Sequence, residues 1–183
     1  MTKTINMVAL FIGIATFTGF GDAPAWAEVE RTSVSAATLS RAFASADALT
    51  HEFLRALERD DPDALRRLRV TETEYREIIL PGSVHEGQPL RHYGKAVADY
   101  AWSNLDTRSR YHEQALLQSY HGRHLTVKAV EYEKGVGRYA NHTAYRQLRL
   151  TLAESKTGQR VRLGTGSIVE IGGRFKFISF IND

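Results

Sequence analysis

Apolar residues recur every three or four positions in the part of the chain that follows residue 38. They run from Leu39 through Phe43, Leu49 and Phe53 to Leu57, a spacing typical of the buried face of a helix. The pattern therefore predicts a helix here, with one apolar side packed against the rest of the protein.

Capping signals divide the helical half of the chain. Asp61 followed by Pro62 predicts a helix start, because an aspartate caps free backbone N–H groups and proline is tolerated in the first turn. Thr71 and Glu74 have the spacing of a capping box, which predicts a second start. A longer helical stretch is predicted over residues 93–120.

After Gly122 the period changes from helical to alternating, which is the pattern of half-buried strands. Strands are predicted over residues 125–133, 141–153, 159–171 and 174–181. Gly172-Gly173 joins the last two strands and suits a two-residue hairpin turn with positive φ angles. Helices followed by antiparallel strands predict an α+β fold.

Pairing the predicted strands across their turns separates two faces. Ile171 opposite Arg174 and Ala153 opposite Arg160 set the registers. One face is hydrocarbon and is assigned to the helix-covered core: Leu148, Leu150, Leu152, Val161, Leu163, Val169, Ile178 and Phe180. The other face mixes charge with aromatic rings, and the residues predicted to form an interface on it are Tyr145, Arg149, Arg162, Ile168, Glu170, Phe175 and Phe177. An ordinary solvated face is the alternative.

The beginning of the chain has the pattern of a secretory signal peptide. Lys3 precedes an apolar stretch, and Ala25-Trp26-Ala27 offers a cleavage site. The predicted organisation is a signal peptide over 1–27, a flexible N-terminus over 28–35 and a single domain over 36–183. An uncleaved anchor is the alternative, although the apolar stretch is shorter than the ~18 residues that span a bilayer. We expect a periplasmic or secreted protein with no membrane span after signal removal.

Composition narrows the classes of function. The 183 residues include no cysteine, which excludes disulfides and a lipid-modified cysteine behind the signal. The formal net charge is +3, too small for a dedicated nucleic-acid binder. The sequence has no H-E-x-x-H spacing and neither Gly-x-Gly pair precedes a helix, so no metal or other cofactor is expected. Asn141 begins an N-H-T sequon, which we interpret as a chance match inside a strand.

Two stretches carry a resemblance to a known superfamily. "RALERDDPDALRRL" links the first helices, and "GSIVEIGGRFKFISFIND" closes the chain. With the order of elements, they resemble the nuclear transport factor 2-like superfamily over most of residues 36–183. "EYREIILPG" and "YAWSNLDTRSR" are similar to stretches of uncharacterised bacterial proteins of this kind. The resemblance implies a curved antiparallel sheet wrapped around a helix as a cone with a pocket. Some members are isomerases, dehydratases or cyclases, and many only bind ligands or partners.

Proton-abstracting enzymes that the chain resembles place an acid, or an Asp-His pair, inside the cone. The predicted hydrocarbon face offers neither, so a base would come from the helices or loops: Glu74, His92, Asp106 or His112. The residues expected to line a ligand pocket are Tyr75, Tyr93, Tyr100 and Trp102. For Asp106 the alternative is an ordinary i,i+4 ion pair with Arg110 on the helix surface.

The missing acid and the mixed outer face together favour a non-catalytic ligand-binding or assembly module that forms a homodimer through that face. The other partners expected for such a module are a small apolar ligand or an envelope protein. The alternative is a small-molecule isomerase, dehydratase or cyclase that uses a helix-borne acid or histidine in the cone.

Overall fold

The computed structural model describes residues 38–182. The predicted signal peptide, its cleavage site and residues 28–35 lie outside the described residues. The chain divides into residues 1–34 and residues 35–183, and every described residue belongs to the second unit. Within the described range no helix is both long enough and apolar enough to cross a membrane.

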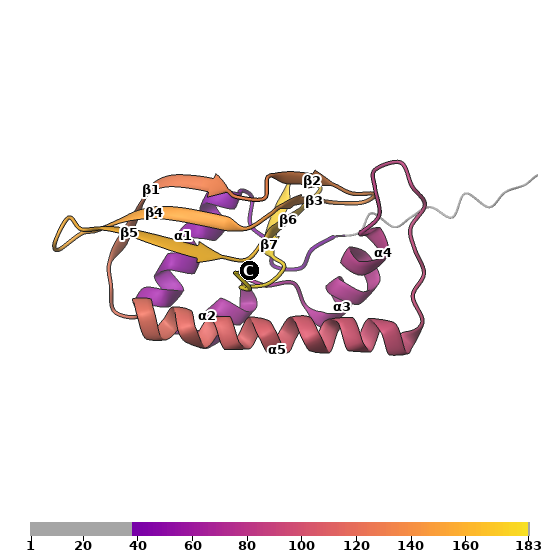
Figure 1. The fold of residues 1–183 in the computed structure, drawn as a ribbon, viewed down its shortest axis with the longest axis horizontal. Helices are drawn as coiled ribbons and strands as arrows, with labels where there is room; N and C mark the ends of the chain where they lie inside the picture. The colour runs from indigo at the N-terminus through magenta and orange to yellow at the C-terminus, as the bar shows by residue number, and fades with distance from the viewer. Residues whose placement is uncertain (1–37, 183) are drawn as a thin grey trace, which may run out of the picture. The chain divides into compact units, whose positions relative to one another are not determined.

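Helices occupy the first half of the described chain. They are α1 (Ala46–Glu58), α2 (Pro62–Arg67), α3 (Glu72–Glu74), a π-helical segment (Tyr75–Ile79), α4 (Leu80–Gly82) and α5 (Lys95–Tyr120). The Asp61 carboxylate accepts a hydrogen bond from the Ala64 backbone N–H at 2.8 Å, as its capping role predicts. Thr71 and Glu74 form both halves of the predicted capping box. In Figure 1, α5 is the long helix that runs past α1 and α2.

Strands occupy the second half of the described chain. They are β1 (Leu125–Tyr132), β2 (Val136–Arg138), β3 (Thr143–Tyr145), β4 (Leu148–Glu154), β5 (Arg160–Thr165), β6 (Ile168–Ile171) and β7 (Arg174–Phe177). They form two antiparallel sheets with the orders β1-β4-β5 and β2-β3-β6-β7. The α+β class is confirmed, and so are the registers that pair Ala153 with Arg160 and Ile171 with Arg174.

Two of the predicted strands are each interrupted, so two sheets stand where the sequence suggested one. Gln147 has a φ of 53°, a left-handed conformation that separates β3 from β4. Gly166 separates β5 from β6 where the backbone passes close to Ser179. A Cβ on Gly166 would lie only 2.0 Å from the Ser179 carbonyl oxygen. The alternation of side chains therefore restarts in a new phase in β6.

The change of phase decides which residues fill the main core. Ile168 and Phe177 are 0% exposed, so their predicted place on an outer interface face is wrong. The rings of Phe53, Phe177 and Phe180 pack together with centroid distances of 5.2 to 5.6 Å. Predicted core residues of β4 and β5 join them: Leu148, Leu150, Leu152 and Leu163, with Val161 partly buried against the cluster.

A second apolar cluster covers the opposite face of β6. Val169 and Ile171 pack there with residues from the segments around α1 and α3: Leu39, Ala42, Val70 and Ile79. Val169 and Ile178, assigned from the sequence to the same face as Leu150, belong to this second cluster instead. Because β6 lies between two clusters, Ile168 on one of its faces and Val169 and Ile171 on the other are buried.

Candidate functional site

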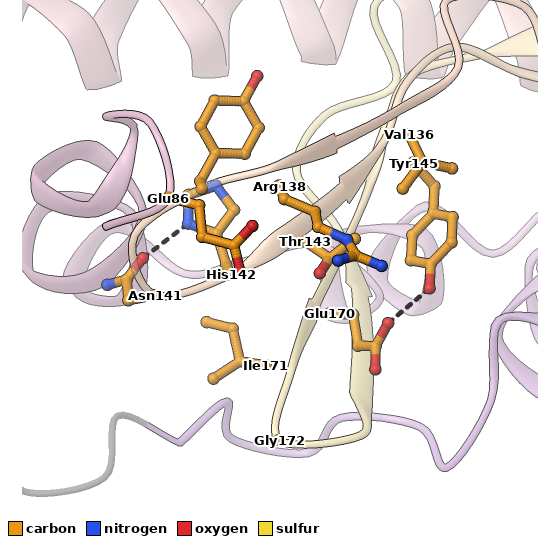
Figure 2. A pocket seen from close by; sticks show the side chains of 11 residues that line it. Glu86, Val136, Arg138, Asn141, His142, Thr143, Tyr145, Glu170, Ile171 and Gly172 are labelled. Carbon is orange, nitrogen blue, oxygen red and sulfur yellow. Dashed lines mark hydrogen bonds between the residues drawn. The ribbon is translucent and has the colours of Figure 1, made fainter. Parts of the chain in front are cut away.

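A polar cavity of about 480 Å³ opens beside the sheet β2-β3-β6-β7. Its walls come from β2, β3, the turn between them, the end of β6 and the loop after α4. The lining residues are Glu86, Val136, Arg138, Tyr139, Asn141, His142, Thr143, Tyr145, Glu170, Ile171 and Gly172. Figure 2 shows these side chains, with Tyr145 and Glu170 pointing toward each other.

Strand register places the central polar side chains in one row. Arg138 pairs with Thr143 across β2 and β3, and Thr143 pairs with Glu170 across β3 and β6. Residues paired in this way point to the same face of a sheet, so the three lie side by side. In the next row Tyr145 pairs with Ile168, which belongs to the main core. The cavity therefore begins where the apolar core ends.

Tyr145 is held by its hydrogen bond and by its neighbours. Its phenol donates a hydrogen bond to the Glu170 carboxylate at 2.5 Å. That bond, with a smaller contribution from burial, raises the pKa of Tyr145 to about 12. The rings of Tyr132 and Phe175 lie 5.1 and 6.1 Å from the Tyr145 ring, centroid to centroid. The phenol therefore stays protonated at neutral pH and is fixed in position.

His142 is a buried, neutral imidazole at the edge of the cavity. Its exposed fraction is 7%, and its ring stacks on Tyr139 at a centroid distance of 4.8 Å. Burial lowers the pKa of His142 to about 4, because the cationic form loses solvation.

Asn141 determines which ring nitrogen of His142 carries the proton. The side-chain amide of Asn141 donates to the Ile78 carbonyl at 2.9 Å, so its Oδ1 faces His142 as an acceptor. Nδ1 of His142 lies 2.7 Å from that oxygen and must donate, which leaves Nε2 as the acceptor of the neutral ring. Gly82 makes room for this contact, since a Cβ there would lie 1.7 Å from Asn141 Oδ1.

The pKa values of Tyr145 and His142 lie far from neutrality. General acid–base groups work best when their pKa lies near the ambient pH. The pKa of Tyr145 is raised and that of His142 is lowered, so both move away from neutrality. Residues 38–182 contain no group of three or more potential metal ligands. The cavity also presents hydrogen-bond donors and acceptors, among them Glu86, Arg138, Thr143 and Glu170.

Glu74, a predicted catalytic candidate, is a buried partner in an ion pair. Its Oε2 accepts from Lys176 Nζ and from the Thr71 backbone N–H, both at 2.7 Å. Its Oε1 accepts from the backbone N–H and hydroxyl of Ser40 at 2.6 and 2.8 Å. Burial raises the pKa of Glu74, but these hydrogen bonds outweigh burial and hold the pKa below its usual value. Glu74 is therefore a structural anion.

Asp106, the second acidic candidate, is also paired. It accepts from Arg110 at 2.7 Å, which confirms the i,i+4 pair considered from the sequence. It also accepts from the buried Arg69 at 3.1 Å, a contact that the sequence did not indicate. Each carboxylate oxygen of Asp106 thus accepts a hydrogen bond from an arginine.

The two histidine candidates lie apart from the polar cavity. His92 is exposed in the loop before α5. His112 packs edge-on against Tyr111, with ring centroids 5.7 Å apart. Neither residue lines the cavity of Figure 2.

The four predicted pocket aromatics are brought together only in part. The rings of Tyr75 and Trp102 lie 5.6 Å apart, whereas Tyr93 contacts Arg91, whose guanidinium carbon is 5.3 Å from the ring centroid. Tyr100 is 72% exposed on α5. None of the four lines the polar cavity.

The predicted interface is divided among the core, the cavity and the solvated surface. Ile168 and Phe177 are in the core, as described above, while Tyr145 and Glu170 line the cavity. Phe175 is half-buried, and its backbone pairs with that of Phe43 before α1. Arg149 bonds Glu133 at 2.5 Å and Arg162 is exposed.

Sequence reasoning missed several residues of the cavity: Glu86, Arg138, Tyr139, His142 and Thr143. For Asn141 the sequence indicated only the start of a sequon. The short run Asn141 to Thr143 was the available signal, since it places amide, imidazole and hydroxyl groups beside a turn. Its significance depends on the β2-β3-β6 register, which joins segments distant in the chain.

No protein-family model, curated protein or solved structure matches this chain. The likeness to the nuclear transport factor 2-like superfamily therefore stays a prediction.

Proposed function

We propose that this protein is a non-catalytic binding module whose polar cavity takes a small polar molecule. The observation that supports the proposal is the displacement of two pKa values away from neutrality, to about 12 for Tyr145 and to about 4 for His142. Neither of these two groups is tuned to move protons at neutral pH, whereas both can take part in hydrogen bonds to a bound molecule.

The charged residues in the cavity walls limit the class of molecule that the cavity can bind. Glu86 and Glu170 outnumber Arg138, which disfavours an anion. Arg138 supplies donors, the two carboxylates supply acceptors, and the Thr143 hydroxyl does both. A neutral molecule rich in hydroxyl groups matches this mixture, in place of the apolar ligand that the sequence suggested.

A panel of monosaccharides and polyols tests the proposal by ligand-observed NMR. We expect Arg138→Ala to weaken binding of a panel member about tenfold or more, because a charged donor is lost. Arg160→Ala is the matched control, since Arg160 is an exposed arginine on β5 that does not line the cavity. Conversion of a panel compound to product, lost in His142→Gln, would replace the proposal with the enzyme alternative.

The extracytoplasmic location and the superfamily likeness remain part of the proposal. The location rests on residues 1–27, and an intact mass of protein from its native host that retains them would contradict it. Self-association is not part of the proposal, because Ile168 and Phe177, two residues of the predicted interface, are buried.

A further inference from the structure

A second cavity, of about 490 Å³, shares no lining residue with the polar cavity. Its described walls contain five cationic side chains and no carboxylate: Arg41, Arg66, Arg67, Arg69 and Lys176. These residues come from the segment before α1, from α2 and the segment that follows it, and from β7. The tertiary structure thus gathers positive charge from three parts of the chain around one hollow.

Arg69 is the arginine that points most strongly to a ligand. It is only 4% exposed, and its Nη1 donates to Asp106 at 3.1 Å. Its Nε and Nη2 are buried and have no hydrogen-bond partner within residues 38–182. These two atoms form one edge of the guanidinium, a fork that fits two oxygens of an oxyanion. Leaving charged donors buried without an acceptor is costly, so an oxyanion at this edge would stabilise the protein.

The surroundings hold Arg69 in place. A smaller cavity of about 170 Å³ shares Arg69 and Arg66 with the larger one and adds Trp102 and Asp106 to its walls. The Arg69 guanidinium carbon lies 5.9 Å from the centroid of the Trp102 ring. Nη1 of Arg69 is thus anchored by a carboxylate and its face by an aromatic ring, while the Nε/Nη2 edge has no partner in the described part of the chain.

The other cations differ in how firmly they are neutralised. Arg66 is paired with Asp63 at 2.9 Å and with Glu113 at 3.2 Å. Arg67 has a looser partner, because its nearest carboxylate oxygen is 3.8 Å away. Arg41 forms no ion pair with any residue in the range 38–182. The exposed Arg41 and Arg67 therefore leave positive charge directed to solvent and to the cavity.

We propose that this cavity binds a phosphate group, which Arg69 grips through its Nε/Nη2 edge together with the exposed Arg41 and Arg67. A phosphate group carries enough charge and enough acceptor oxygens to meet several guanidinium forks from different directions, as a single carboxylate does not. The site is separate from the polar cavity and does not depend on the function proposed for it.

An internal use of the same donors is the competing explanation. Glu113 is 2% exposed, and its Oε2 is also buried without a hydrogen-bond partner in the described chain. A water bridging that oxygen to Arg69 would satisfy both groups. In that case the stability of the protein would not respond to phosphate.

Titration of the full chain with inorganic phosphate, at ionic strength held constant with chloride, separates the two explanations. We expect phosphate to raise the thermal unfolding midpoint in a saturable way that chloride does not reproduce. Arg67→Ala and Arg41→Ala should each weaken the affinity for phosphate about tenfold or more, whereas Arg160→Ala should leave it unchanged. Arg69→Gln should abolish the response, but it also removes an ion pair with Asp106, so the two exposed variants are decisive.

A second arm uses glycerol 3-phosphate in place of inorganic phosphate. Binding of either compound that depends on Arg41 and Arg67 supports the site. Tighter binding of glycerol 3-phosphate would identify a phosphate ester as the ligand, and tighter binding of inorganic phosphate would identify free phosphate. The proposal is overturned if neither compound stabilises the protein beyond chloride. It is equally overturned if Arg160→Ala weakens binding as much as Arg67→Ala does.

Discussion

Individual buried charges in this protein are satisfied to very different degrees. The Glu74 carboxylate accepts hydrogen bonds from Lys176, from Thr71 and twice from Ser40. Within residues 38–182 the Arg69 guanidinium donates only to Asp106, and two of its buried nitrogens have no hydrogen-bond partner there. A fully matched carboxylate has no capacity left for a ligand, whereas an unmatched guanidinium edge has. This contrast makes Glu74 structural and makes Arg69 the centre of a proposed site.

His142 should make the stability of the protein depend on pH between about 4 and 6.5. Its pKa is about 4 in the folded protein, against about 6.5 for an exposed histidine. Between these values the unfolded chain binds a proton that the folded protein does not, so the free energy of unfolding falls as the pH falls. The expected loss from this residue is on the order of 1–3 kcal/mol.

Chemical denaturation at pH 7 and at pH 4.5 measures this effect. His142→Gln should show a smaller decrease in the free energy of unfolding than the wild type. His51→Gln, which removes an exposed histidine, should behave like the wild type. Equal decreases in the wild type and in His142→Gln would show that the imidazole is not buried in its neutral form.

At the scale of elements, contacts between residues a few positions apart set the ends of the helices. The close approach of backbone segments that are distant in the chain divided the strands. Asp61 and Thr71 cap helices through contacts with residues three positions away, so sequence spacing was enough to predict them. The break at Gly166 follows from a contact with Ser179, thirteen positions along the chain, and alternation cannot reveal it. Registers near turns were predicted correctly, because a turn determines which residues pair.

At the scale of the whole molecule, the sheet β2-β3-β6-β7 contributes residues to both apolar clusters and to the walls of the polar cavity. Ile168 and Phe177 face the main core, and Val169 faces the second cluster. The C-terminal segment closes the main core against α5, where the Phe180 backbone N–H donates to Ser109 Oγ at 2.9 Å. The positions of both proposed sites follow from this arrangement, since each lies where an apolar cluster gives way to polar side chains.

Phe177→Glu should unfold or strongly destabilise the protein. Phe177 is 0% exposed and packs against Phe53 and Phe180, so the variant buries an unpaired charge and loses ring contacts. A loss of about 4 kcal/mol or more is expected in the free energy of unfolding. Tyr111→Glu is the control, because Tyr111 is 71% exposed and a change within about 0.5 kcal/mol is expected there. A Phe177→Glu protein with wild-type stability in urea denaturation would place this ring on the surface.

The sequence by itself determined the α+β class, the helix caps and the hairpin registers, because these depend on residues a few positions apart. It also indicated the hydrocarbon face of β4 and β5, since alternation holds for as long as a strand is unbroken. Tertiary structure alone decided that Phe177 is core and that Arg138 and Glu170 lie in one row on either side of Thr143. It also brought Arg41, Arg69 and Lys176 to one cavity. The physical reason is that a single close contact, as at Gly166, changes which side chains of the following strand face the core. Such contacts join segments that are far apart in the chain, so the periodic pattern of apolar residues does not reveal them.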